Sequence, residues 1–407
     1  MRKTRTVRLG AALMVVIAVL MTGQWTRVEA GGIDGGYRVL KPIQSGDLTL
    51  FPVVRTDGKA SPADQFLTLD EGLKSGEVEV TEAGKVQGLV RSRGTATPWR
   101  YLGDQVNTLV LVNNSKRPLV LLAGEIVTGG KQDRVIAKDR IVPAGADPID
   151  LSVFCIEHGR WTESSAKFGT TAKNATGSFM VQPSVRQQAM VAKDQQQVWN
   201  SVGGAISTMS VVAGPRPSVD ANANVTVGGL VVTGPMHGNA PVFMDGRSAL
   251  GTTSYAKAMQ TEAVSAKVDD EAAGLVQSRE QALATLRQEH AVGVVVAVRG
   301  EVIWADIFSN TELLARYWTK LVRSYAAEGL GSGVSHGTAS IADAQRFLDA
   351  PSRGREDTEG EVGVYRYREV KAGGTDLFAL EVLLPGTGYD IHVSKLKLKG
   401  PGWNTQP

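Results

Sequence analysis

The order of apolar and polar residues predicts short strands in the first part of the chain. Residues 48–54 and 77–80 form β-prone runs with short alternations of apolar and polar side chains. Residues 149–155 place apolar side chains at every second position, as a strand does when one of its faces is buried. We therefore expect β-structure on both sides of residue 100.

Two pairs of apolar runs are predicted to form hairpins. Runs 108–112 and 118–122 flank a segment of asparagine, serine and lysine, and asparagine tolerates the positive φ of tight turns. Runs 292–298 and 301–306 flank an Arg-Gly turn. Further strands are expected near residues 362–368, 377–384 and 391–398.

Helical periodicity is clearest after residue 308. Ser309 and Glu312 have the spacing of a capping box, in which both side chains satisfy free amides at a helix start. Apolar residues then recur at three- and four-residue steps along one helix face: Leu314, Tyr317, Trp318, Leu321, Val322 and Tyr325. Other helices are expected at about 183–206, 255–289 and 341–348. Hairpins and separate helices indicate an α+β fold, with antiparallel or mixed sheets and several packed helices.

Composition divides the chain into three parts. Residues 209–252 are rich in Gly, Pro, Asn, Thr and Ser and lack periodicity, which predicts an exposed insertion near 209–250. The insertion interrupts a predicted domain at 31–330. The helix and strands of 331–407 are expected to pack on that same domain.

The first thirty residues have the pattern of a secretory signal peptide. A basic start precedes 15 apolar-rich residues at 9–23, and the segment ends on the small residue Ala30. This apolar stretch is shorter than the roughly 20 residues that a transmembrane helix needs. We expect cleavage after Ala30 and a periplasmic or extracellular product without a stable membrane anchor. The alternative is a retained anchor.

Removal of this leader changes the charge balance. The whole chain carries +3 and the leader +4, from five basic residues and one acidic residue, so the remainder carries −1. A surface that binds a polyanion would leave an excess of Lys and Arg, so nucleic acid is not an expected partner. Cys155 is the single cysteine, which excludes an intrachain disulfide.

Two apolar runs end in glycines and long polar side chains, and these ends define the rim, residues 125–161. One end extends from Glu125 to Arg134 and the other from Glu157 to Trp161. Binding sites are commonly built where a rigid scaffold presents such a variable edge. The rim contains no recognised catalytic or cofactor motif.

Basic side chains beside glycines make the rim a candidate anion site. Glycines let backbone amides approach a ligand, and guanidinium groups bind carboxylate or phosphate in a bidentate fork. Lys131, Arg134 and Arg160 are the candidate anion contacts, with Gln132 and Trp161 as further ligand contacts. The alternatives are solvated loop charges or structural ion pairs, and for Trp161 a cover over the edge of the core.

The carboxylates of the rim are candidates for proton transfer. Glu125 and Glu157 could act near neutral pH if burial tunes their pKa values. The alternative is a pair of strand-end carboxylates bound to nearby basic residues. The five histidines are scattered and lack the spacing of metal ligands, so neither a metal nor another cofactor is expected.

Two further residues have competing interpretations. Cys155 shares an apolar strand face, so we expect a buried thiol of raised pKa in preference to a nucleophile. Asp306 ends an apolar run just before the best helix. It is either a ligand-binding residue or a partner of the helix start.

Together these segments resemble a family of uncharacterised bacterial domain proteins called ARPP, named for genomic association with ADP-ribosylglycohydrolases and rhodanese-like phosphatases. The resemblance extends over roughly residues 46–329 and rests on Glu125 with its Leu-Leu-Ala-Gly prefix, the Gly-Gly-Lys-Gln-Asp-Arg run, the block from Cys155 to Trp161, and Asp306 with the later Tyr-Trp pair. It implies a role near nucleotide or ADP-ribose chemistry, although an exported protein meets little cytosolic nucleotide.

Two classes of function follow from these observations. The first is a secreted protein that binds a small anionic or polar ligand at the rim. The second is a hydrolase or transferase that acts on a phosphate- or nucleotide-derived substrate. An enzyme should bring its carboxylate within about 5 Å of the basic groups in one site. Protein partners and oligomeric state are not specified by the sequence.

Overall fold

The computed structural model describes residues 36–57, 65–83, 85, 108–160, 162–171, 178–213, 225–227, 230–232, 250–276, 279–331 and 337–398. The predicted leader and its cleavage point lie outside these residues. So do Trp161 and most of the predicted insertion.

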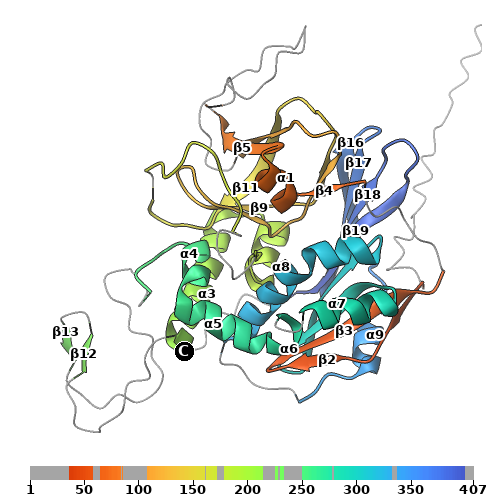
Figure 1. The fold of residues 1–407 in the computed structure, drawn as a ribbon. Helices are drawn as coiled ribbons and strands as arrows, with labels where there is room; N and C mark the ends of the chain where they lie inside the picture. The colour runs from red at the N-terminus through yellow and green to blue at the C-terminus, as the bar shows by residue number, and fades with distance from the viewer. Residues whose placement is uncertain are drawn as a thin grey trace, which may run out of the picture.

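The largest sheet in the described part of the chain has nine antiparallel strands (Figure 1). Its order is β1-β3-β14-β15-β19-β18-β17-β16, with β2 paired to β3. The strands are β1 (Tyr37–Val39), β2 (Ile43–Ser45), β3 (Leu48–Arg55), β14 (Ala291–Val298), β15 (Glu301–Phe308), β16 (Arg355–Glu361), β17 (Tyr365–Ala372), β18 (Thr375–Val382) and β19 (Tyr389–Lys397). Strands from both ends of the described chain therefore share one sheet. The predicted β14–β15 hairpin is confirmed.

Two smaller sheets form a second β-region. One has the order β5-β6-β11-β9-β8 and the other β10-β7-β4, in which β4 and β7 are parallel. Their strands are β4 (Leu67–Thr68), β5 (Val78–Glu82), β6 (Thr108–Asn113), β7 (Leu119–Leu121), β8 (Ile126–Val127), β9 (Arg134–Ile136), β10 (Arg140–Val142) and β11 (Ile149–Cys155). The strand predicted at 149–155 is confirmed as β11.

The hairpin predicted from runs 108–112 and 118–122 is wrong. Strand β6 lies between β5 and β11, whereas β7 pairs with β10 and β4. The Asn113 side chain explains the separation, because it donates to the carbonyls of Arg117, Val142 and Pro143. This contact fixes the start of the connecting segment beside the end of β10 instead of folding it back on β6.

The helices are α1 (Leu69–Ser75), α2 (Pro183–Gln187), the π-helix η2 (Gln188–Ala192), α3 (Gln195–Ala213), α4 (Tyr255–Gln260), α5 (Glu262–Glu271), α6 (Ala273–Val276), α7 (Arg279–Gln288), α8 (Thr311–Gly329) and α9 (Ile341–Asp349). The helix expected at 183–206 is interrupted after η2, where Lys193 adopts a positive φ of 53°. The helical segment at 255–289 is divided among α4 to α7. Within the predicted insertion, β12 (Val225–Val227) pairs with β13 (Leu230–Val232).

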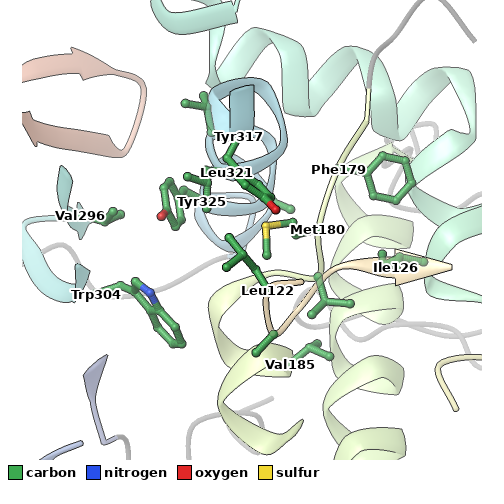
Figure 2. Packing of buried hydrophobic residues seen from close by; sticks show 14 of the residues in the cluster. Leu122, Ile126, Phe179, Met180, Val185, Val296, Trp304, Tyr317, Leu321 and Tyr325 are labelled. Carbon is green, nitrogen blue, oxygen red and sulfur yellow. The ribbon is translucent and has the colours of Figure 1, made fainter. Parts of the chain in front are cut away.

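Helix α8 is the central helix of the larger core. Its predicted apolar stripe is buried throughout, and the helix packs against α2, α5, α7 and the large sheet. Figure 2 shows Leu321 and Tyr325 of α8 beside Leu122 and Met180. Each such fully buried side chain contributes about 1.5–3 kcal/mol. The predicted cap needs correction, because Asn310 and not Ser309 accepts the Leu313 amide, at 2.8 Å.

Helix α9 packs on the opposite face of the large sheet. Ala344 and Leu348 of α9 pack there against Phe51, Val295 and Ala305. The part of the large sheet around β14 and β15 is therefore buried on both faces, with α8 on one side and α9 on the other. These layers confirm the predicted α+β class.

Candidate functional site

The glycine loop of the rim, around Gly129 and Gly130, has a backbone conformation and a packing that only glycine allows at these two positions. Gly129 and Gly130 have φ values of 131° and 51°. A Cβ on Gly130 would collide with the Phe168 ring and lie 2.8 Å from Glu82 Oε1, and one on Gly129 would collide with Ser165 Oγ. The two glycines therefore permit both the turn and its close packing.

Asp133 holds this loop from within. Its Oδ1 accepts the Gly129 amide at 3.0 Å, and its Oδ2 accepts the Ser254 hydroxyl at 2.7 Å. Its own amide donates to Glu157 Oε2 at 3.2 Å. Burial raises the pKa of Asp133, the Ser254 bond lowers it, and the Glu157 charge raises it again, with a net rise. Asp133 thus joins the loop to α4 and to the second half of the rim.

Glu157 is bound by two cations. Its side chain is 3% exposed, and its oxygens lie 2.6 Å from Arg160 Nη2 and 2.8 Å from Lys257 Nζ. Burial raises the pKa of Glu157, but the bonds from Arg160 and Lys257 outweigh burial and hold the pKa below its usual value. Glu157 is therefore ionised near neutral pH, which suits a structural anion better than a proton donor.

Arg160 clamps the glycine loop. Its Nη1 donates to the carbonyls of Gly130 at 2.8 Å and Thr162 at 2.9 Å, and its Nη2 donates to Gly129 O at 3.3 Å. Nη2 also lies 3.6 Å from Asp133 Oδ1. The two terminal nitrogens of Arg160 therefore contact backbone carbonyls of the loop and the carboxylates of Asp133 and Glu157.

Lys131, Arg134 and Gln132 complete the loop, and each has a different set of hydrogen bonds. The Lys131 amide donates to Glu82 Oε1 at 3.0 Å, and the buried Arg134 donates to Gln132 O at 2.7 Å. Gln132 is fully buried, and neither Oε1 nor Nε2 of its side chain has a hydrogen-bond partner in the described part of the chain. We call these interacting residues the rim cluster: Glu82, Gly129, Gly130, Lys131, Gln132, Asp133, Arg134, Glu157, Arg160, Ser254 and Lys257.

Glu125 belongs to a different cluster. It is fully buried, and its Oε1 accepts Lys320 Nζ at 2.6 Å while its Oε2 accepts the Leu122 amide at 2.8 Å. Lys320 Nζ also lies 2.9 Å from Asp70. Burial raises the pKa of Glu125 and outweighs the attraction of Lys320. The structure therefore does not join Glu125 to Glu157 through any shared partner among the residues described.

Asp306 lies in a third cluster, buried between the large sheet and α2. Arg186 Nη1 donates to Asp306 Oδ2 at 2.9 Å, and Tyr325 donates to the same oxygen. Ser394 donates to Oδ1 at 2.6 Å, and His392 Nε2 lies 3.2 Å from Oδ1. Burial raises the pKa of Asp306, but Arg186 and then His392 hold it well below its usual range.

His392 links this cluster to the smaller sheets. Its Nδ1 lies 2.6 Å from Asp139 Oδ2, and Asp139 Oδ1 accepts the Ala123 amide at 2.7 Å. Burial lowers the pKa of His392, but Asp139 and then Asp306 raise it, to about 9. The protonated ring therefore lies between two buried carboxylates. Among the described residues, no bond joins the Asp306 side chain to the start of α8, so the second interpretation of this residue is wrong.

Several partners in these clusters carry no signal in the sequence. Lys257 and Ser254 lie about 100 residues beyond the rim carboxylates that they bind. Glu82 precedes the rim, and Arg186 lies 120 residues before Asp306. The tertiary fold alone brings them together. The predicted core position of Cys155 agrees with its full burial, which raises the pKa of its thiol to about 11.

In the parts of the chain that the structure describes, no group of three or more His, Cys, Asp or Glu side chains is arranged so that it could hold a metal ion. Within the same parts, no helix has the length and apolar character needed to span a membrane. Trp161 is outside the described residues.

Comparison with known proteins identifies the family. The model of the ARPP-1 family, the ARG and Rhodanese-Phosphatase-superfamily-associated Protein domain, matches residues 36–396. The chain therefore belongs to this family, and the match extends beyond residues 46–329 at both ends. No curated protein and no solved structure matches the chain.

Proposed function

We propose that this ARPP-1 domain protein binds a small anionic or polar ligand at the rim cluster, outside the cytoplasm after export. The observation that carries the proposal is the state of Lys257. Its side chain is 55% exposed, and it gives one bond to Glu157 in the described part of the chain. An ammonium group has three donors, so two remain for a ligand.

The charge of the rim cluster supports an anion. Lys131, Arg134, Arg160 and Lys257 supply four positive charges, against three carboxylates from Glu82, Asp133 and Glu157. The carboxylates are buried, whereas Lys257 is the most exposed charge. The positive charge that a ligand in solvent can reach most easily is therefore that of Lys257.

The exposure and the contacts of the basic residues suggest different roles for them. Arg160 is 17% exposed and its terminal nitrogens bind loop carbonyls and Glu157. Arg134 is 2% exposed. We therefore propose that Arg160 and Arg134 hold the loop, while Lys257 contacts the ligand directly. In this proposal, Arg134 and Arg160 are no longer direct anion contacts, and Lys257, which the sequence did not indicate, becomes one.

We favour binding over the alternative, a hydrolase or transferase for a phosphate- or nucleotide-derived substrate. The two candidate catalytic carboxylates occupy different clusters and hold different cations. Glu157, the one beside the exposed lysine, has a lowered pKa and two charged partners. General acid catalysis near pH 7 needs a carboxyl group of raised pKa.

The test is anion-induced thermal stabilisation at low ionic strength, with inorganic phosphate and acetate as probes. We expect the wild type to be stabilised and the Lys257→Gln variant to lose the effect. Lys193→Gln is a matched control, because Lys193 is 54% exposed and pairs with Glu369, which is 3% exposed. Equal stabilisation of wild type and Lys257→Gln, or none in the wild type, would overturn the proposal.

A further inference from the structure

We infer that Gln132 is the recognition residue for a carboxamide or peptide group in the ligand of the rim cluster. This inference rests on the proposed function and names the chemical class of its ligand. The ligand would carry an amide for Gln132 and a carboxylate for Lys257, as an N-acylated amino acid or a short peptide does.

The basis is a contrast within one loop. The neighbouring groups are bound: the Lys131 amide by Glu82, the Asp133 side chain by Gly129 and Ser254, and the Gln132 carbonyl by Arg134. The Gln132 side chain is 0% exposed, yet both its polar atoms lack a partner among the described residues. Buried polar groups in folded proteins are nearly always hydrogen-bonded, so this amide needs a partner from outside the described chain.

The loop is built so that Gln132 cannot easily turn out to solvent. Gly129 and Gly130 have positive φ and pack without room for a Cβ. The residues on both sides of Gln132 are fixed through Glu82 and through Glu157. A loop held in one conformation in this way is preorganised, so it can bind a ligand at low entropic cost.

The chemistry of the side chain selects the partner. A glutamine amide offers an acceptor, Oε1, beside a donor, Nε2. Phosphate and carboxylate anions offer acceptors, and an ammonium group offers donors. A carboxamide or peptide group offers both, so it can satisfy both atoms of Gln132.

Chain connectivity places this subsite next to the anion contact. Gln132 immediately precedes Asp133, whose amide binds Glu157, and Glu157 in turn binds Lys257. Asp133 also binds Ser254, three residues before Lys257. Gln132 and Lys257 therefore belong to one bonded network, and a ligand that carries both an amide and a carboxylate is the probe that tests their joint use.

The experiment compares acetate, acetamide and N-acetylglycine by calorimetric titration of the full chain. In the wild type we expect N-acetylglycine to bind at least about tenfold more tightly than acetate, since a satisfied amide pair contributes on the order of one factor of ten. Gln132→Met, which keeps the length of the side chain without its polar atoms, should bind both probes equally. Lys257→Gln should lose both.

A second readout does not depend on the variant. The side-chain amide protons of Gln132, observed by NMR in the wild type, should shift with N-acetylglycine and acetamide and stay unchanged with acetate. If acetate and N-acetylglycine bind equally to the wild type and Lys257→Gln abolishes both, the anion site stands and the amide inference is overturned. If no probe binds and the Gln132 protons never shift, the amide inference is overturned, and the proposed function fails with it if phosphate also gives no thermal stabilisation.

Discussion

Replacement of Arg186 by methionine is the most informative perturbation of the buried charges. Arg186 and Asp306 are 1% and 0% exposed, and the Arg186 guanidinium also lies 4.8 Å from the centre of the Trp304 ring. Methionine keeps the apolar stem but leaves two buried carboxylates, Asp306 and Asp139, with the His392 ring between them as their one cation among the described residues. Removal of one partner of a buried ion pair costs about 3–5 kcal/mol, out of a total stability of about 5–15 kcal/mol.

The assay is urea unfolding followed by fluorescence and circular dichroism. With a dependence of about 3 kcal/mol per M urea, the midpoint should fall by about 1–2 M. Arg287→Met is the matched control, because Arg287 forms a two-bond pair with Glu312 at 50% and 48% exposure. Exposed pairs contribute about 0–1 kcal/mol, so its midpoint should move little.

A rescue variant separates charge from packing. Asp306→Asn in the Arg186→Met background removes the excess negative charge of the cluster and should recover part of the lost stability. If Arg186→Met costs no more than Arg287→Met, the account of a buried charge cluster is refuted. If the double variant is less stable than Arg186→Met, the loss comes from packing.

Three further predictions follow from buried groups and from the leader. The pKa of His392 is raised from 6.5 to about 9, so the protonated ring stabilises the fold fully below about pH 6.5 and this stabilisation is lost as the pH rises through about 9. The urea midpoint of the wild type should therefore fall between about pH 6 and about pH 10. The midpoint of His392→Gln should depend less on pH over the same range. The Cys155 thiol, with a pKa of about 11, should resist a thiol reagent at pH 8 in the native protein and react in urea, whereas rapid native reaction would contradict its burial. Mass spectrometry of the exported protein should find Gly31 at its N-terminus, and a full-length chain recovered from membranes would refute cleavage after Ala30.

Local periodicity predicted the elements whose burial follows a simple pattern. The α8 stripe and the β14–β15 hairpin are examples, because each places apolar residues toward one core within a short stretch of chain. Strand β16 was missed, since its charged residues are almost all exposed and carry no apolar alternation. The 108–122 hairpin failed because tertiary contacts of Asn113 overrode a local turn signal.

The sequence located the rim but could not assign its partners. Glu157 and Arg160 are three residues apart, so their pairing is a local event. Lys257 and Ser254 reach the same cluster from α4 and its cap, about 100 residues away, through a fold that one sequence does not specify. The same limit separated Glu125 and Asp306 from the rim, because each pairs with a distant cation.

The most direct test of ligand binding at the rim cluster is a crystal structure with selenate, an anomalous scatterer that replaces phosphate. The account predicts an anomalous peak within hydrogen-bonding distance of Lys257 Nζ, with Glu157 still bound to Arg160. Selenate found only elsewhere, with Lys257 unchanged on Glu157, would contradict it.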